Sequence, residues 1–133
     1  MKSAIARRVT SNQGRGILSR WARNWRCRLG PLLHGDLWGG NRLSDEQGQP
    51  VIFDPAVYYG DREADLAMTR LFGGYGAGFY AAYEAAWALD AGAATRIDLY
   101  NLYHVLNHLN LFGASYLGQA NAMIDRLLGE VGR

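Results

Sequence analysis

Cysteine, lysine and long apolar runs are all scarce in this 133-residue chain. Its single cysteine, Cys27, excludes an internal disulfide and any metal site built from several cysteines. No apolar run approaches the roughly 18 residues that a membrane span needs, and no apolar leader precedes a small-residue cleavage site. We therefore expect a cytoplasmic protein with no membrane partner.

Acidic residues are absent from residues 1–30, which carry Lys2 and seven arginines and so a formal charge of +8. The rest of the chain holds six arginines and twelve acids, a charge of −6. This break near Gly30-Pro31 predicts a basic, poorly ordered segment over 1–30 and a domain over 31–133. A nucleic-acid-binding arm, a transit peptide and a segment foreign to the domain, as after a shifted reading frame, all fit such a composition. We favour the last and expect no nucleic-acid partner, because no nucleic-acid-binding fold follows.

An acid, an imidazole, an amide and three glycines gather in the stretch His34-Gly35-Asp36-Leu37-Trp38-Gly39-Gly40-Asn41. Asp36 and Asn41 have the Asp-x-x-x-x-Asn spacing with which protein-kinase-type loops aim a catalytic acid and an amide metal ligand at one phosphate. We interpret the stretch as a phosphotransferase catalytic loop, with Asp36 as the catalytic residue and Asn41 as a metal ligand.

Such a loop needs a second metal-binding acid at the end of a nearby strand. The apolar run 51–53 leads to Asp54, and Pro55 then stops the strand. A polar connection at 45–49 joins residues 42–44 to residues 50–53 and predicts a hairpin that sets Asn41 beside Asp54. The alternative is an ordinary loop and hairpin that bind no metal.

Helical spacing dominates the second half of the chain. Asp61 is placed to cap a helix that ends at Gly73-Gly74. Two later helices are expected from about Arg96 to Phe112 and from Ser115 to Leu128. Another helix is expected between the one capped by Asp61 and the one that begins near Arg96. Its buried face is expected to hold Phe79, Ala82, Tyr83, Ala86 and Trp87. The predicted fold class is mostly α with a small β-hairpin, an α+β arrangement.

Three motifs carry a resemblance to a known family. They are residues 32–41 with the loop above, the run Phe53-Asp54-Pro55-Ala56-Val57-Tyr58-Tyr59-Gly60-Asp61-Arg62-Glu63-Ala64-Asp65-Leu66-Ala67-Met68-Thr69, and residues 99–113 ending in Asn107-His108-Leu109-Asn110-Leu111-Phe112-Gly113. Over roughly residues 31–129 the chain resembles the fructosamine kinase (ketosamine-3-kinase) family. That family is similar to the aminoglycoside and choline phosphotransferases of the protein-kinase-like superfamily. The resemblance implies the C-terminal lobe of a protein-kinase-like fold, with the N-terminal lobe missing.

The resemblance also implies a reaction, in which ATP and Mg²⁺ serve to phosphorylate the sugar 3-hydroxyl of a ketosamine. The substrate would be a glycated amine or protein, so the activity would be a deglycation repair. On this reading Asp36 is the base, and Asn41 and Asp54 hold Mg²⁺. His34 and Asp65 support the loop.

Three further residues are candidates for substrate binding: Trp38, His104 and His108. Trp38 would either stack on the sugar or pack under the loop, and tryptophan suits both roles equally. His104 and His108 are four residues apart on one helical face, a spacing that can bind zinc, but no third ligand is evident. A substrate-pocket or hydrogen-bonded interior role for the two histidines is favoured.

Two parts of an ATP site have no counterpart in the sequence. Lys2 is the single lysine and lies outside any apolar strand, and Gly14-Arg15-Gly16 lacks the third glycine of a phosphate-covering loop. We therefore expect a truncated kinase that is inactive alone and that needs a missing N-terminal lobe or associates with itself. A non-catalytic remnant of such a kinase, or an aminoglycoside- or choline-type phosphotransferase, is the alternative.

Overall fold

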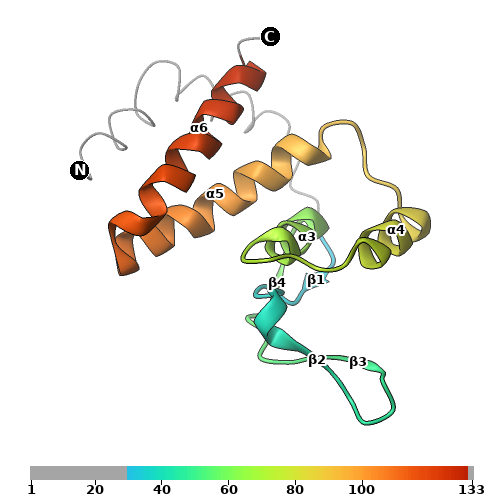
Figure 1. The fold of residues 1–133 in the computed structure, drawn as a ribbon. Coiled ribbons are helices and arrows are strands. Elements are labelled where there is room, and N and C mark those ends of the chain that lie inside the picture. The colour runs from blue at the N-terminus through green and yellow to red at the C-terminus, as the bar shows by residue number, and fades with distance from the viewer. Residues whose placement is uncertain (1–29, 132–133) are drawn as a thin grey trace. The chain divides into compact units, whose positions relative to one another are not determined.

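The computed structural model describes residues 30–131 (Figure 1), so nearly all of the basic segment predicted over 1–30 lies outside the described residues. These residues divide into two compact units, residues 30–101 and residues 102–131, each described here by itself. No helix in the described range has both the length and the apolar character needed to cross a bilayer.

Two small antiparallel sheets stand at the start of the first unit. In one, β1 (Leu32–Leu33) pairs with β4 (Tyr58–Tyr59). In the other, β2 (Arg42–Ser44) pairs with β3 (Pro50–Ile52), which confirms the predicted hairpin. Its turn forms because the Asp45 carboxylate accepts the amide protons of Gln47 at 2.9 Å and Gln49 at 2.7 Å.

Helix α3 (Arg62–Arg70) begins at the predicted cap. The Asp61 carboxylate accepts a hydrogen bond from the Glu63 amide at 3.0 Å and so satisfies one of the amides that a helix leaves unpaired. The helix ends before the predicted Gly73-Gly74, because Leu71 is already extended with ψ 149°. Phe72, Gly73 and Gly74 then follow with positive φ values and reverse the chain.

The core of the first unit forms where α3 meets α4 (Ala77–Ala86) and the first part of α5 (Ala93–Phe112). Its buried residues are Leu66, Ala67 and Ile97, and the half-buried side chains packed on them are Phe79, Tyr80, Tyr83, Leu89 and Tyr100. The predicted face of α4 is therefore partly wrong: Ala82, Ala86 and Trp87 are exposed, Trp87 by 61%. Tyr80 takes their place, because its hydroxyl donates to the Thr69 carbonyl of α3 at 3.1 Å.

The second unit contains the rest of α5, a 3-10 turn (Ala114–Tyr116) and α6 (Leu117–Val131). Gly113, with φ 90°, separates α5 from the turn, as expected of a glycine after a helix. The buried apolar side chains of this unit are Leu102, Val105, Ala120, Met123, Ile124 and Leu127.

One arginine joins α3 to α5 in the first unit. Arg96 donates to both carboxylate oxygens of Glu63, at 2.6 and 2.7 Å, and to Asp90 at 2.6 Å. The side chain of Glu63 is 8% exposed, whereas that of Asp90 is 71% exposed. The hydrogen bonds to Glu63, and then the one to Asp90, raise the pKa of the Arg96 guanidinium, while the Arg96 hydrogen bond lowers the pKa of Asp90.

We expect the two acids to differ sharply in their effect on stability. Glu63→Gln should lower the free energy of unfolding by about 2–3 kcal/mol, because it removes a buried, charge-assisted pair of hydrogen bonds. Asp90→Asn should cost clearly less, since water screens an exposed pair. Urea unfolding of the chain followed by far-UV circular dichroism measures both. Equal losses would contradict the importance of the buried pair.

Candidate active site

The loop between β1 and β2 runs directly against the segment that follows β3. The Ala56 amide donates to the His34 carbonyl at 2.8 Å. At Gly35 the backbone has φ 81°, and a Cβ atom there would collide with the Ala56 carbonyl oxygen. Glycine is therefore required at this position by both conformation and space.

The structure brings Asp36 and Asn41 into direct contact. The Asn41 side-chain amide donates to the Asp36 carboxylate at 2.9 Å and to the Asp36 carbonyl at 2.9 Å. A 3-10 turn (Gly39–Asn41) closes the loop, and Asn41 is only 6% exposed. Because its NH₂ group is used in this way, the Asn41 Oδ1 atom points elsewhere, and it makes no hydrogen bond with any described residue.

Asp54 is held beside this loop through its neighbour Phe53. The Phe53 amide donates to the Asn41 carbonyl at 3.1 Å, and the His34 Nε2 atom lies 3.0 Å from the Phe53 carbonyl oxygen. Asp54 itself is exposed and has φ 54°, a left-handed conformation that only Asp, Asn and Gly adopt with any ease. A strained backbone at a chemically reactive residue is typical of functional sites.

Asp65, in the first turn of α3, binds the start of the loop. Its two carboxylate oxygens accept the amide protons of His34 at 2.7 Å and Gly35 at 2.8 Å. The Asp36 amide donates to the His34 Nδ1 atom at 3.3 Å, so the neutral ring carries its proton on Nε2 and donates to Phe53. The imidazole thus links the loop to the Asp54 segment.

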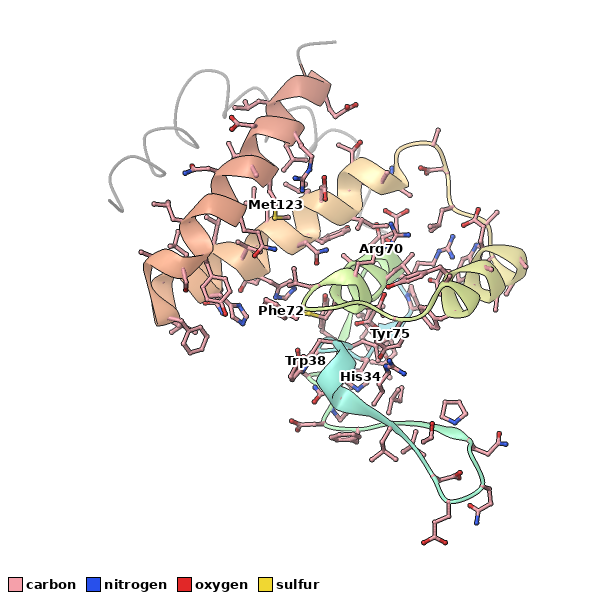
Figure 2. The ribbon with its side chains drawn as sticks, in the orientation of Figure 1. His34, Trp38, Arg70, Phe72, Tyr75 and Met123 are labelled. Carbon is pink, nitrogen blue, oxygen red and sulfur yellow. The ribbon has the colours of Figure 1, made fainter. Side chains whose placement is uncertain are left out.

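Trp38 lies within the same loop, with His34, as Figure 2 shows. Its six-membered ring covers Gly40, where an added Cβ atom would collide with it. The residue is nevertheless 38% exposed. Packing on the loop and stacking on a ligand are therefore compatible, and both stay predictions.

His104 and His108 belong to the second unit. The His108 Nδ1 atom lies 2.8 Å from the His104 carbonyl oxygen, and the ring packs against Phe112 at 5.3 Å and Tyr116 at 5.2 Å. Residues 30–131 contain no group of three or more His, Cys, Asp or Glu side chains arranged to hold a metal ion.

Two tyrosines near the loop were not predicted as site residues. Burial raises the pKa of Tyr58, and the charges of Asp65 and Asp61 raise it further. Burial also raises the pKa of Tyr75, although Arg42, whose guanidinium lies 4.4 Å from the centre of the Tyr75 ring, opposes this. Sequence spacing carries no signal for the Arg42–Tyr75 contact, because the two residues lie in different segments.

Removal of the Asp65 carboxylate should loosen the start of the loop. In Asp65→Ala the amides of His34 and Gly35 lose their acceptors. The free energy of local opening should then fall by about 1–2 kcal/mol, and the hydrogen exchange of these amides should become about tenfold faster. Exchange mass spectrometry of peptides covering 33–41 measures this. Asp45→Ala is the matched control, because Asp45 also accepts two backbone amides but in the hairpin turn. Unchanged exchange in Asp65→Ala would contradict the anchoring role.

Comparison of the sequence with known proteins indicates the family of this chain. A sequence model described as fructosamine kinase matches residues 7–130. The chain is 55% identical over 97 residues to a probable ketoamine kinase from Synechocystis sp., covering 73% of this chain and 33% of that protein. It is 52% identical over 97 residues to the chloroplastic protein-ribulosamine 3-kinase of Arabidopsis thaliana, covering 73% of this chain and 29% of that protein.

Solved structures agree with the sequence matches. A candidate fructosamine-3-kinase from Thermobifida fusca has a TM-score of 0.69 at 33% identity, covering 94% of this chain and 45% of that one. Another, from Haemophilus somnus, has a TM-score of 0.74 at 28% identity, covering 88% of this chain and 40% of that one. The predicted fold class, mostly helical with a small antiparallel sheet on a kinase-like fold, is confirmed.

The extent of these matches bears on the domain organisation. The chain spans about a third of the length of the curated relatives it matches. The family match begins at residue 7, within the basic segment, whose separate origin stays a prediction. The chain belongs to the fructosamine kinase family.

Proposed function

We propose that this chain supplies the catalytic loop of an ATP-dependent kinase that phosphorylates the sugar 3-hydroxyl of ketosamines. The observation that supports this most directly is the contact between Asp36 and Asn41, with Asp54 held next to them through Phe53. The names of the relatives, ketoamine kinase and ribulosamine 3-kinase, point to the same class of substrate. A glycated amine or protein would be the substrate, and the cytoplasm is the proposed location.

The oxygen atoms of the loop suit a magnesium ion. Mg²⁺ prefers hard oxygen ligands, and Asn41 Oδ1 and the Asp54 carboxylate are such atoms, engaged in no hydrogen bond with the described residues. Both would hold the ion, which when bound would neutralise charge on the ATP phosphates. Because the Asn41 NH₂ group donates to Asp36, the Asn41 oxygen is left available for that role.

Asp36 would act on the sugar. One carboxylate oxygen accepts from Asn41, which leaves the other to accept the proton of the sugar hydroxyl and to orient its lone pair toward phosphorus. A strongly basic group is not needed, because phosphoryl transfer depends mainly on positioning and charge. His34 and Asp65 would keep the loop in place, and Trp38, His104 and His108 are proposed to contact the substrate.

A graft experiment tests this function. The matching segment of the Synechocystis relative is replaced by the 97 matched residues of this chain, and phosphate transfer from labelled ATP to a fructosyl amine is measured. We expect activity in the graft and a fall in kcat of about 10²–10⁴-fold in its Asp36→Asn variant, because the positioned base is lost. Asp45→Asn, in the hairpin turn, is the control and should leave kcat unchanged.

Either of two results would overturn the proposal. A folded but inactive graft would favour a non-catalytic remnant over an enzyme. Full activity in Asp36→Asn would remove Asp36 from the chemistry.

The 133-residue chain alone should bind Mg-ATP only weakly. Kinases of this fold use a strand-borne lysine and a glycine-rich loop to hold the phosphates, and the single lysine here is Lys2. Isothermal titration of Mg-ATP into the purified chain should therefore give no saturable binding in the micromolar range. A micromolar dissociation constant would contradict this.

A further inference from the structure

The hairpin of β2 and β3 carries a proposed metal ligand at each of its two ends. Asn41 comes directly before β2, and Asp54 follows β3 after Phe53. All six strand residues are exposed, and a two-stranded hairpin is only marginally stable by itself. Contacts that hold the hairpin in one orientation therefore also govern how Asn41 and Asp54 face each other.

Arg42 provides one such contact. Neighbouring residues of a strand point to opposite faces, so Arg42, the first residue of β2, lies on the face opposite to Leu43. Its guanidinium carbon lies 4.4 Å from the centre of the Tyr75 ring, within the range of a cation–π interaction. Arg42 makes no hydrogen bond or ion pair with the part of the chain that the structure describes. The Tyr75 ring is thus the restraint on this charged group that the described residues supply.

Tyr75 is itself firmly held. Its amide donates to the Tyr80 hydroxyl at 3.1 Å, and that hydroxyl donates to the Thr69 carbonyl of α3. Its ring meets the Phe79 ring edge to face, with centres 4.8 Å apart. Tyr75 therefore connects the hairpin to α3 and α4, the same framework from which Asp65 binds the other end of the loop.

We propose that the stacking of Arg42 on Tyr75 is a positioning contact for the metal ligands Asn41 and Asp54. This inference rests on the function proposed above. Arg42 and Tyr75 touch neither substrate nor metal; they hold the hairpin so that its two ends face a common point.

The ring of Tyr75, rather than its hydroxyl, carries this role. The hydroxyl oxygen is buried and has no hydrogen-bond partner among the described residues. A buried hydroxyl without a hydrogen-bond partner costs free energy, so its removal should not destabilise the chain. Tyr75→Phe keeps the ring face for Arg42 and therefore serves as the conservative variant.

Hydrogen exchange in the 133-residue chain tests the contact without any need for activity. In Arg42→Ala and Tyr75→Ala, peptides covering 41–54 should exchange about two- to fivefold faster, as expected for the loss of one cation–π contact. The double variant should add little to either single one, because both remove the same interaction. Tyr75→Phe should exchange like the parent.

Arg70→Ala is the matched control. Arg70 also stacks on a tyrosine, with its guanidinium 5.0 Å from the Tyr80 ring centre, but no hydrogen bond, ion pair or ring contact joins it to the described residues of the hairpin (Figure 2 labels Arg70 and Tyr75). Exchange over 41–54 should stay unchanged in this variant. Equal acceleration in Arg70→Ala, or none in Arg42→Ala, would overturn the proposal.

The graft described above separates positioning from mere stability. Arg42→Ala and Tyr75→Ala should raise the Mg²⁺ concentration for half-maximal activity about two- to fivefold, with the KM for the fructosyl amine unchanged, and Tyr75→Phe should restore the parent value. An active graft whose Mg²⁺ requirement does not change would overturn the positioning role alone. An inactive parent graft would instead count against the proposed function, whatever the exchange data show.

Discussion

The rest of the candidate site depends on one carboxylate, that of Asp65, which accepts two successive backbone amides. Hydrogen bonds to an ionised acceptor are stronger than neutral ones, and two of them fix both the position and the direction of the chain at His34 and Gly35. Asp65 lies in α3 next to Leu66 and Ala67, which are buried in the core of the first unit. The start of the loop over residues 34–41 is therefore held by the helical core of the first unit.

His34 connects this anchor to the segment around Asp54, through both its imidazole and its backbone carbonyl. His34 is bonded to Asp65 by its amide, to the Phe53 carbonyl by Nε2 and to the Ala56 amide by its carbonyl. These last two bonds bracket Asp54 on both sides. A left-handed Asp costs free energy, of the order of 1 kcal/mol, and persists only where its flanks are held in this way. The conformation of Asp54 thus follows from contacts that begin in α3.

How far the sequence could predict this structure depends on the range of the contacts involved. The hairpin and the cap at Asp61 were predictable, because the Asp45 turn and the bond to Glu63 each lie within a few residues. The face of α4 was not, because the Tyr80 hydroxyl selects it by reaching back 11 residues to Thr69. In the site, the spacing of Asp36 and Asn41 indicated their convergence, but only coordinates show which end of the Asn41 amide meets the acid.

The orientation of the Asn41 side-chain amide determines which of its atoms is available to a ligand of the site. With its NH₂ group donated to Asp36, Asn41 presents an oxygen, and Asp36 and Asp54 add two negative charges. No arginine or histidine of the described residues forms an ion pair with either acid, and the Arg42 guanidinium lies over the Tyr75 ring. The hydrogen bonds that shape the loop thus leave the Asn41 Oδ1 atom and the Asp54 carboxylate without a hydrogen-bond partner among the described residues, as the proposed Mg²⁺ site would require.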